Sequence, residues 1–252
     1  MSRIPKNVHF VFGFKEQTEE FKMLFYLAVL SASVIIKPDV INFHCFNEPH
    51  GEWWEKTKSL IVYRKIDTDV MYWGDKLITK YAHKADKYRI ETLQREGGIY
   101  LDIDTICVKP IDDLLTNSVV MGIEHINEHD GVPLLCNAII MAEPNAPFIN
   151  MWISNYYGYF HPEGWGQASV YLPGCISRSI PQHIKILDTD AFFWPGIFES
   201  DLIWSKESPI SENLRIQHLW FNVGIPDITL EYLKTVKCRY STLAQPLLPY
   251  LE

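Results

Sequence analysis

The chain has 252 residues, of which 47% are hydrophobic and 21% are charged, and its formal net charge of −8 argues against a nucleic-acid partner, which would need a basic surface. A chain of this length can bury a core without disulfides or a structural metal. The cysteines are odd in number and include no CxxC pair, which indicates free thiols rather than a disulfide framework or a zinc finger: Cys45, Cys107, Cys136, Cys175 and Cys238.

Strand and helix patterns alternate in the first third of the chain. Strands are predicted over residues 8–12, 40–46 and 60–66, and a helix over about residues 18–36 that Pro38 ends. Strands separated by helical patterns indicate βαβ crossovers, so the predicted fold class is α/β with a mainly parallel sheet flanked by helices.

The apolar segment FKMLFYLAVLSASVII (21–36) requires a membrane check. It is shorter than the ~20 residues that usually span a bilayer, and it follows the acidic EQTEE where a signal peptide would be basic. Because it also lies between two predicted strands, we predict a buried core helix and no transmembrane segment.

A helix predicted over about residues 75–96 carries an acidic residue on its apolar stripe, which consists of Ala82, Asp86, Ile90 and Leu93. Asp86 on this stripe needs a partner, and either Arg89, one turn later, or a bound ligand could supply it. Gly97 and Gly98 end the helix, and a strand follows at once.

That strand, in REGGIYLDIDTICVKP (95–110), contains two further acidic residues. Side chains alternate along a strand, so Tyr100, Asp102 and Asp104 are predicted to share one face, with roughly 6.6 Å between alternate residues. Two such carboxylates could share a hard divalent cation such as Mg²⁺ or Mn²⁺. The alternative is a solvated strand end.

Later elements are predicted as strands over 118–124 and 134–142 and helices over 147–157 and 228–236. Neither an internal repeat nor a linker is visible. We therefore predict one domain, residues 1–252, whose final third wraps the carboxyl edge of the sheet, where ligands of open α/β sheets bind.

The central segment ADKYRIETLQREGGIYLDIDTICVKPIDDLL (85–115) resembles the signature of the DXD-containing glycosyltransferases of family 32, which include α-mannosyl, α-galactosyl and capsular-polysaccharide transferases. The matching positions are Asp86, Arg89, Leu93, Gly97, Gly98, Tyr100, Asp102 and Asp104. IPKNVHFVFG, CNAIIMAEPNAPFI and IQHLW are similar to further family segments. The chain departs from the pattern at LPGC (172–175), where the family often has T-G-P, and at HLWFNVG, which lacks a Ser-Trp.

This resemblance implies a GT-A fold (Rossmann-like), with a nucleotide-sugar-binding part over about residues 1–115 and an acceptor and closing part over about 116–252. It implies a UDP-sugar or GDP-sugar donor, a divalent metal, usually Mn²⁺ with Mg²⁺ as the alternative, and retention of anomeric configuration. The expected function is transfer of a hexose to a saccharide or lipid-linked saccharide (glycolipid) acceptor in polysaccharide biosynthesis. The expected location is cytoplasmic, with peripheral membrane contact if the acceptor is lipid-linked.

By the same resemblance, each matching residue has an expected role. Asp86 and Arg89 lie near the donor sugar, with Tyr100 also on the donor-binding side. Asp102 lies near ribose and metal, Asp104 lies on the metal, and His218 is a late metal or diphosphate contact. Phe12 and Gly13 border the base.

Asp102 and Asp104 are the expected catalytic residues, together with Asn137 of CNAII. Asn137 either neighbours the sugar's reacting centre or caps a strand start, and the sequence leaves both roles open. No spacing identifies a covalent nucleophile, which favours front-face transfer over double displacement. The alternatives from other classes are an inactive relative that only binds sugar nucleotides and a metal-dependent hydrolase.

A pair of histidines and the tryptophan-rich segments could also suggest binding sites, but each has a simpler structural explanation. His125 and His129 in EHINEHDG are four residues apart, as in some zinc sites, but the HExxH order is absent, so a polar loop is predicted. The Trp-rich segments EWWE and GYFHPEGWG could stack on sugar rings, although core packing explains most such aromatics.

Overall fold

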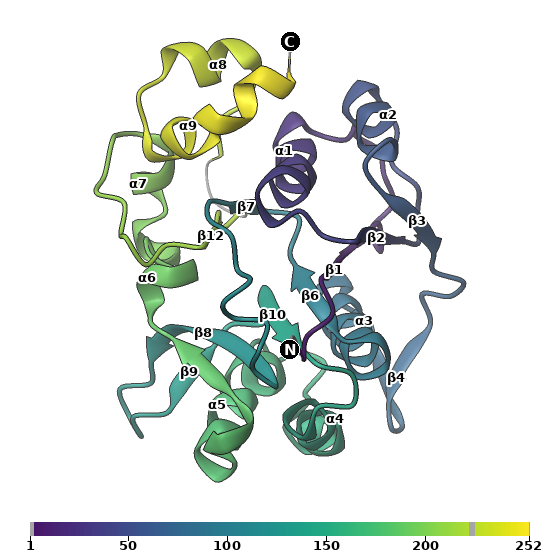
Figure 1. Ribbon diagram of the computed structural model, residues 1–252. Helices are drawn as coiled ribbons and strands as arrows, with labels where there is room; N and C mark the ends of the chain where they lie inside the picture. Colours follow the sequence, from purple (N-terminus) through teal and green to yellow (C-terminus); the bar gives the residue numbers. More distant parts are fainter. Residues whose placement is uncertain (1–2, 222–224, 252) are drawn as a thin grey trace.

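The computed structural model describes residues 3–221 and 225–251, so the end of HLWFNVG (222–224) lies outside the described residues. Its strands are β1 (Asn7–Phe12), β2 (Val40–Cys45), β3 (Val62–Lys65), β4 (Met71–Trp73), β5 (Lys76–Ile78), β6 (Gly98–Leu101), β7 (Thr105–Cys107), β8 (Val119–Ile126), β9 (Pro133–Leu135), β10 (Ile139–Ala142), β11 (Lys185–Leu187) and β12 (Ile216–His218). The main sheet has the order β11-β8-β10-β6-β1-β2-β3, with β9 paired to β8 (Figure 1). Two-stranded sheets join β7 to β12 and β4 to β5.

Helices cover both faces of the main sheet. They are α1 (Met23–Ser31), α2 (Glu52–Lys58), α3 (Tyr81–Glu96), α4 (Pro147–Tyr159), α5 (Leu172–Ser179), α6 (Thr189–Phe192), α7 (Asp201–Trp204), α8 (Leu230–Thr235) and α9 (Arg239–Ala244). Short π-helical turns span Ala32–Ile36 and Gln167–Tyr171, and 3₁₀ turns span Pro181–His183, Ile197–Glu199 and Gln245–Tyr250. Helix α1 belongs to the core on one face of the sheet, and α3 and α4 belong to the core on the other.

The sheet is mixed, and its parallel half confirms the predicted βαβ arrangement. Strand β1 pairs in parallel with β2 and β6, and β2 pairs in parallel with β3. Strand β10 is antiparallel to both β6 and β8. The carboxyl end of β6 therefore lies in the middle of the sheet, which is where the predicted acidic motif begins.

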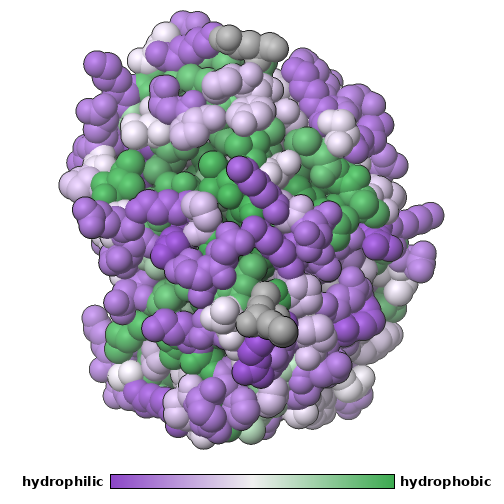
Figure 2. Space-filling view, viewed as in Figure 1, coloured by the Kyte–Doolittle hydropathy of each residue, from purple (hydrophilic) through white to green (hydrophobic). Residues whose placement is uncertain are grey.

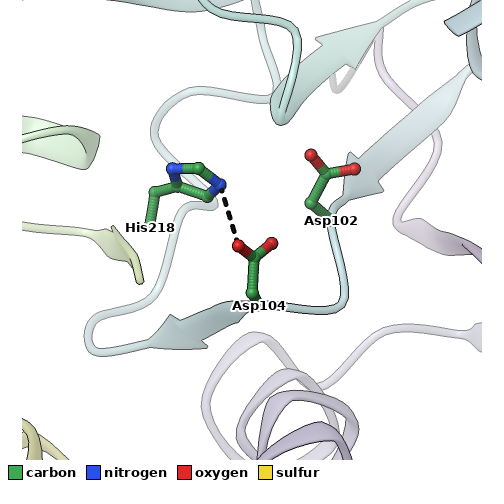
Figure 3. Close-up of side chains that lie close together, drawn as sticks. All are labelled: Asp102, Asp104 and His218. Carbon is green, nitrogen blue, oxygen red and sulfur yellow. Dashed lines mark ion pairs between the residues drawn. The ribbon is translucent and has the colours of Figure 1, made fainter. Parts of the chain in front are cut away.

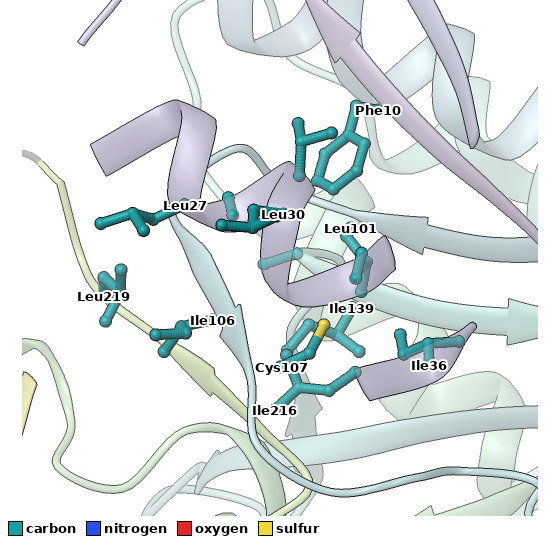
Figure 4. Packing of buried hydrophobic residues seen from close by; sticks show 14 of the residues in the cluster. Phe10, Leu27, Leu30, Ile36, Leu101, Ile106, Cys107, Ile139, Ile216 and Leu219 are labelled. Carbon is teal, nitrogen blue, oxygen red and sulfur yellow. The ribbon is translucent and has the colours of Figure 1, made fainter. Parts of the chain in front are cut away.

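Helix α1 is a core helix, as predicted. All nine of its residues are buried, because the sheet covers one side of it and the strands β7 and β12 approach another. Figure 4 shows Leu27 and Leu30 of α1 beside Ile106 of β7 and Ile216 of β12, with Leu101 of β6 in the same cluster. Burial of this kind stabilises a fold by roughly 25 cal/mol for each Å² of apolar surface removed from water.

The face of the molecule seen in Figure 2 is largely polar, and the cysteines are free thiols as predicted. Polar side chains cover much of the face seen in Figure 2, and apolar side chains gather in its upper half, at the level of α1. The five cysteines are free. Within residues 3–221 and 225–251, no helix is both long and apolar enough to cross a membrane.

Four predicted elements had wrong boundaries. The helix predicted from residue 75 begins at Tyr81, because the β4–β5 hairpin turns at Gly74, whose φ is +60°. The helix predicted from residue 18 begins at Met23, and its last turn is π-helical and ends at the left-handed Lys37. The strand predicted over 134–142 is interrupted between β9 and β10, and the strand predicted through Asp104 ends at Leu101.

Gly97 joins α3 to β6 in a conformation that only glycine adopts readily, with φ 65° and ψ −163°. A Cβ on Gly97 would lie 2.7 Å from the Pro144 ring. We expect Gly97→Ala to lower the free energy of unfolding by about 2 kcal/mol or more in denaturant titrations. Gly158→Ala, near the end of α4 with open space around the new methyl group, should instead raise it by about 0.5–1 kcal/mol. Equal effects of the two substitutions would contradict this account.

Two buried histidines link β1 and β2 beneath α3. His9 Nδ1 lies 3.0 Å from His44 Nε2, and His44 Nδ1 lies 3.3 Å from the Tyr88 hydroxyl. Burial lowers the pKa of His9 to about 4 and that of His44 to about 3, although the nearby Glu96 carboxylate acts in the opposite direction. Both rings are therefore neutral packed residues at pH 7.

This pair should make the fold acid-sensitive. Because the unfolded histidines take up protons near pH 6.5 and the folded ones do so only below about pH 4, stability should fall as the pH drops through that window. From pH 6.5 to 4.5, each histidine should account for about 2 kcal/mol of lost unfolding free energy. In urea titrations His44→Asn should reduce this loss by about half, whereas the exposed loop substitution His129→Asn should leave it unchanged.

Candidate active site

Asp102, Asp104 and His218 meet beyond the carboxyl end of β6. Asp102 follows β6 directly, Asp104 lies in the turn before β7, and His218 ends β12, which pairs with β7. Their ligand atoms lie within 4.8 Å of one another. Figure 3 shows the three side chains close together, with the His218 ring facing the Asp104 carboxylate and 3.4 Å between His218 Nε2 and Asp104 Oδ2. The structure thus brings together the residues that the resemblance assigns to the metal.

The backbone fixes both aspartates. The Asp102 amide donates to the Ala138 carbonyl over 2.8 Å, and the Leu219 amide donates to the Asp104 carbonyl over 2.9 Å. The Phe221 amide donates to Asp104 Oδ2, also over 2.9 Å. The site therefore depends on three segments that are distant in sequence. It also lies in a turn, so the prediction that both carboxylates share one face of a continuous strand was wrong.

Burial and charge act against each other at these groups. Burial would raise the pKa of Asp104, but His218 and the Phe221 amide outweigh it and hold that pKa below its usual range. Burial would lower the pKa of His218, but Asp104 outweighs it and raises that pKa. Burial raises the pKa of Asp102, and Arg89 offsets the effect only in part. A cation placed among the two carboxylates would offset the cost of burying them.

Arg89 is the centre of a buried network on the donor-binding side of the predicted site. Its Nη1 lies 3.1 Å from Asp102 Oδ1 and donates to the Asn137 carbonyl over 2.8 Å. Its Nη2 lies 3.6 Å from Asp86 Oδ1, and its guanidinium lies 4.4 Å from the centre of the Tyr100 ring. Of the two partners considered for Asp86, Arg89 is therefore present in the structure, and it also pairs with Asp102.

Asn137 and Tyr100 complete this network. Asn137 lies in the turn between β9 and β10, and its side chain donates to Asp86 Oδ1 over 2.7 Å. The Tyr100 hydroxyl donates to Asp102 Oδ1 over 2.5 Å. Asn137 thus contacts a predicted site residue instead of capping β10. The alternation along β6 holds up to Leu101, since Tyr100 packs on one face of the sheet while its two neighbours pack on the other.

Two adjoining cavities open at this edge of the sheet. One has a volume of about 350 Å³, and its lining includes the residues of the buried network other than Tyr100, together with Asp104, His218, Glu124 and Trp165. The other, of about 340 Å³, is lined by Phe12, Gly13 and the loop 14–20 that precedes α1. Ile103 and Phe221 line both cavities, so a single elongated ligand could reach from one into the other.

Comparison with known proteins agrees with this geometry. The family described as "Glycosyltransferase sugar-binding region containing DXD motif" matches residues 13–121. "Glucan organizing enzyme 1" of Cryptococcus neoformans var. grubii is 37% identical over 201 residues, an alignment that covers 76% of this chain and 54% of that protein. The chain belongs to the glycosyltransferases that carry a DXD motif. It spans about half the length of that curated relative.

The fold of these glycosyltransferases is the GT-A fold, as predicted. Apo mouse xyloside xylosyltransferase 1 superimposes with a TM-score of 0.53, over 87% of this chain and 99% of that chain, at 12% identity. At this identity the likeness concerns the fold alone. The DXD aspartates of the present glycosyltransferase are Asp102 and Asp104.

Sequence reasoning missed three residues that line the cavity of this DXD site. Glu124, at the end of β8, is a carboxylate within the lining. His83 is buried one turn before Asp86, and Trp165 lies in the loop after α4 with 68% of its surface exposed. No periodicity marks them, because each reaches the cavity from a different element. The signals in the sequence were the aromatic segment GYFHPEGWG, which contains Trp165, and the polar segment EHINEHDG, which begins with Glu124.

The histidines of EHINEHDG form no zinc site among the described residues. His125 has an exposed side chain that lies 3.4 Å from Glu124, and His129 is exposed in the turn between β8 and β9. Within the described part of the chain, the group of acidic and histidine side chains close enough to hold a metal is the one formed by Asp102, Asp104 and His218. The predicted polar loop begins only at Asn127, because β8 extends through His125 to Ile126.

Proposed function

We propose that this glycosyltransferase is a metal-dependent, retaining enzyme that moves a hexose from a UDP-sugar or GDP-sugar to a saccharide or lipid-linked saccharide. The observation that carries the proposal is the meeting of Asp102, Asp104 and His218 at one end of a cavity that Asp86, Arg89 and Asn137 also line. The word glucan in the name of the Cryptococcus relative supports a saccharide acceptor.

The three converging residues suit a divalent cation. Two carboxylates and one imidazole provide a mixed oxygen and nitrogen set that matches Mn²⁺, and Mg²⁺ is the alternative with a stronger preference for oxygen. Asp104 and His218 would hold the ion, with Asp102 beside it. When bound, such an ion supplies Lewis-acid stabilisation of the charge that develops on a departing diphosphate.

The two cavities suggest how a sugar nucleotide would lie. The nucleoside would occupy the cavity that Phe12 and Gly13 border, within the first 115 residues, and the diphosphate would pass Ile103 to reach the metal site. Asp86 and Arg89, which line the other cavity, would then contact the hexose. Their mutual contacts fix both side chains before the donor arrives, so little ordering would remain for binding.

Transfer with retention would proceed on the face from which the diphosphate leaves. The acceptor hydroxyl forms the new bond to the anomeric carbon as the bond to the phosphate oxygen breaks, and the hydroxyl proton passes to that leaving oxygen. The carbon gains positive character during this exchange. The carboxylate of Asp86 and the amide oxygen of Asn137 would stabilise that character, and the Asn137–Asp86 hydrogen bond holds the two groups together.

Glu124 offers the competing double-displacement route, because its carboxylate also lines the cavity. That route would form a covalent glycosyl ester on Glu124 and then transfer the sugar to the acceptor. Front-face transfer predicts that mass spectrometry of the trapped enzyme finds no such ester. A glycosylated Glu124 peptide would replace the front-face proposal with double displacement.

One assay tests the function. The protein is incubated with UDP-glucose, UDP-galactose and GDP-mannose, with Mn²⁺ or with a chelator, and both nucleotide release and sugar transfer are measured. We expect Mn²⁺-dependent release from at least one donor and transfer to a saccharide. If nucleotide is released but the sugar is transferred only to water, whichever acceptor is present, the result would support a hydrolase. If no donor releases its nucleotide, the result would support an inactive binding relative.

A further inference from the structure

We propose that Trp165 and His83 form an acceptor subsite that binds a pyranose ring of a saccharide. The proposal rests on the proposed transferase function, because the subsite is defined by its place beside the donor sugar. Trp165 is a large aromatic side chain that is 68% exposed and lines the same cavity as the DXD aspartates. A tryptophan in this setting exposes a broad apolar face next to polar groups, which suits the stacking of a sugar ring.

His83 supplies a second, independent observation. It is 5% exposed, and its Nδ1 has no hydrogen-bond partner among the described residues. Burial lowers the pKa of His83, so its ring is neutral at pH 7. A neutral imidazole has one nitrogen that donates and one that accepts, so the unpartnered Nδ1 can bond to a hydroxyl group, which both donates and accepts. A buried polar nitrogen without a partner is costly, and a sugar hydroxyl would satisfy it.

The two rings are held together. The centroids of the His83 and Trp165 rings are 5.9 Å apart, and the Phe160 ring also packs against His83, with 5.3 Å between centroids and an interplanar angle of 81°. Figure 1 shows α3, which carries His83, on the same side of the sheet as α4, which precedes Trp165. The two rings are therefore held by packing and line the cavity together.

The position along α3 identifies the occupant as the acceptor. His83 precedes Asp86 by three residues, which corresponds to about 4.5 Å along the helix axis. If the donor hexose contacts Asp86 and Arg89, a ring against Trp165 lies beside that hexose. The nucleoside has its own cavity at Phe12 and Gly13. A neighbouring sugar is thus the remaining ligand, and its hydroxyl can face the anomeric carbon.

The test uses the full chain and separates donor chemistry from acceptor binding. The probes are cellobiose, laminaribiose, maltose and lactose, and their binding is measured by saturation-transfer NMR without any donor. Transfer to them and acceptor-free nucleotide release are then measured with the three sugar nucleotides and Mn²⁺. We expect Trp165→Ala to raise the acceptor KM about tenfold or more, or about 1.4 kcal/mol, and to change acceptor-free release by much less. Trp165→Phe should keep most of the affinity.

His83 and a surface aromatic provide the matched comparisons. His83→Phe should retain the packing but weaken acceptor binding, because it removes the nitrogen that bonds to the sugar hydroxyl. Tyr72→Ala, which removes a 48%-exposed aromatic side chain on the β4–β5 hairpin, should change nothing. The subsite would be overturned if the wild-type protein bound none of the four disaccharides. It would also be overturned if wild type and Trp165→Ala bound them equally well. Trp165-dependent binding without any nucleotide release would keep the subsite and remove the proposed function.

Discussion

Replacing Asp104 with asparagine is expected to lower kcat/KM for Mn²⁺-dependent donor turnover by about a thousandfold, or about 4 kcal/mol of transition-state stabilisation. The neutral amide is a poor ligand for a hard cation. The fold should persist, because an asparagine oxygen can still accept from the Phe221 amide as Asp104 Oδ2 does. Turnover measured against Mn²⁺ concentration, together with direct Mn²⁺ titration of the donor-free protein, checks both parts.

The matched control is Asp113→Asn. Asp113 is an exposed aspartate that pairs with Arg215 on the surface, with 2.9 Å between Oδ2 and Nη2, so its loss should cost at most about 1 kcal/mol of stability and leave turnover unchanged. Asp104→Asn with unaltered Mn²⁺ affinity and unaltered donor affinity would refute the assignment of Asp104 to the metal.

Arg89→Met is expected to produce the largest loss of stability. Arg89 is 5% exposed, and its removal leaves the carboxylates of Asp86 and Asp102 without their counter-charge. Breaking a buried pair from one side costs about 3–5 kcal/mol, which corresponds to a fall in Tm of roughly 10 °C for a chain of this size. Calorimetry at pH 7 measures the loss, and donor turnover should fall with it.

Two comparisons test the physical reason. Arg95→Met removes an arginine from the same helix, but Arg95 is 61% exposed at its side chain and pairs with Glu96 at the surface, so the loss should be at most about 1 kcal/mol. Adding Asp86→Asn to Arg89→Met should recover part of the stability, because one unpaired charge is removed. If the double variant is less stable than Arg89→Met alone, the charge argument is wrong.

Those parts of the fold that depend on local pattern were predictable. The nearly continuous apolar runs at β1 and β2 and the apolar segment of α1 indicate buried elements, because each is covered on more than one side. Gly97 and Gly98 mark the end of α3 for the steric reason that the structure displays. The β4–β5 hairpin was missed because its strands have three residues each, too few for a period to appear.

The site was predictable in composition but not in geometry. The alternation rule correctly placed Tyr100 beside Asp102, but it carried the strand too far. The Asp102 amide still bonds to Ala138 in continuation of the β6–β10 pairing, and the chain turns directly after it. The Asn137–Asp86 hydrogen bond joins residues 51 positions apart. Contacts of that range depend on how β10 pairs with β6, which no local pattern encodes.

The hydrogen bond from the Phe221 amide to the Asp104 carboxylate also has a consequence for the synthesis of the chain. The amide that holds the Asp104 carboxylate belongs to Phe221, 117 residues later in the chain. A ribosome makes the aspartates long before it makes β12, so a nascent chain carrying β1 to β7 has the carboxylates without the histidine or the amide. The three side chains and the amide can therefore meet only after Phe221 has been made, 117 residues after Asp104.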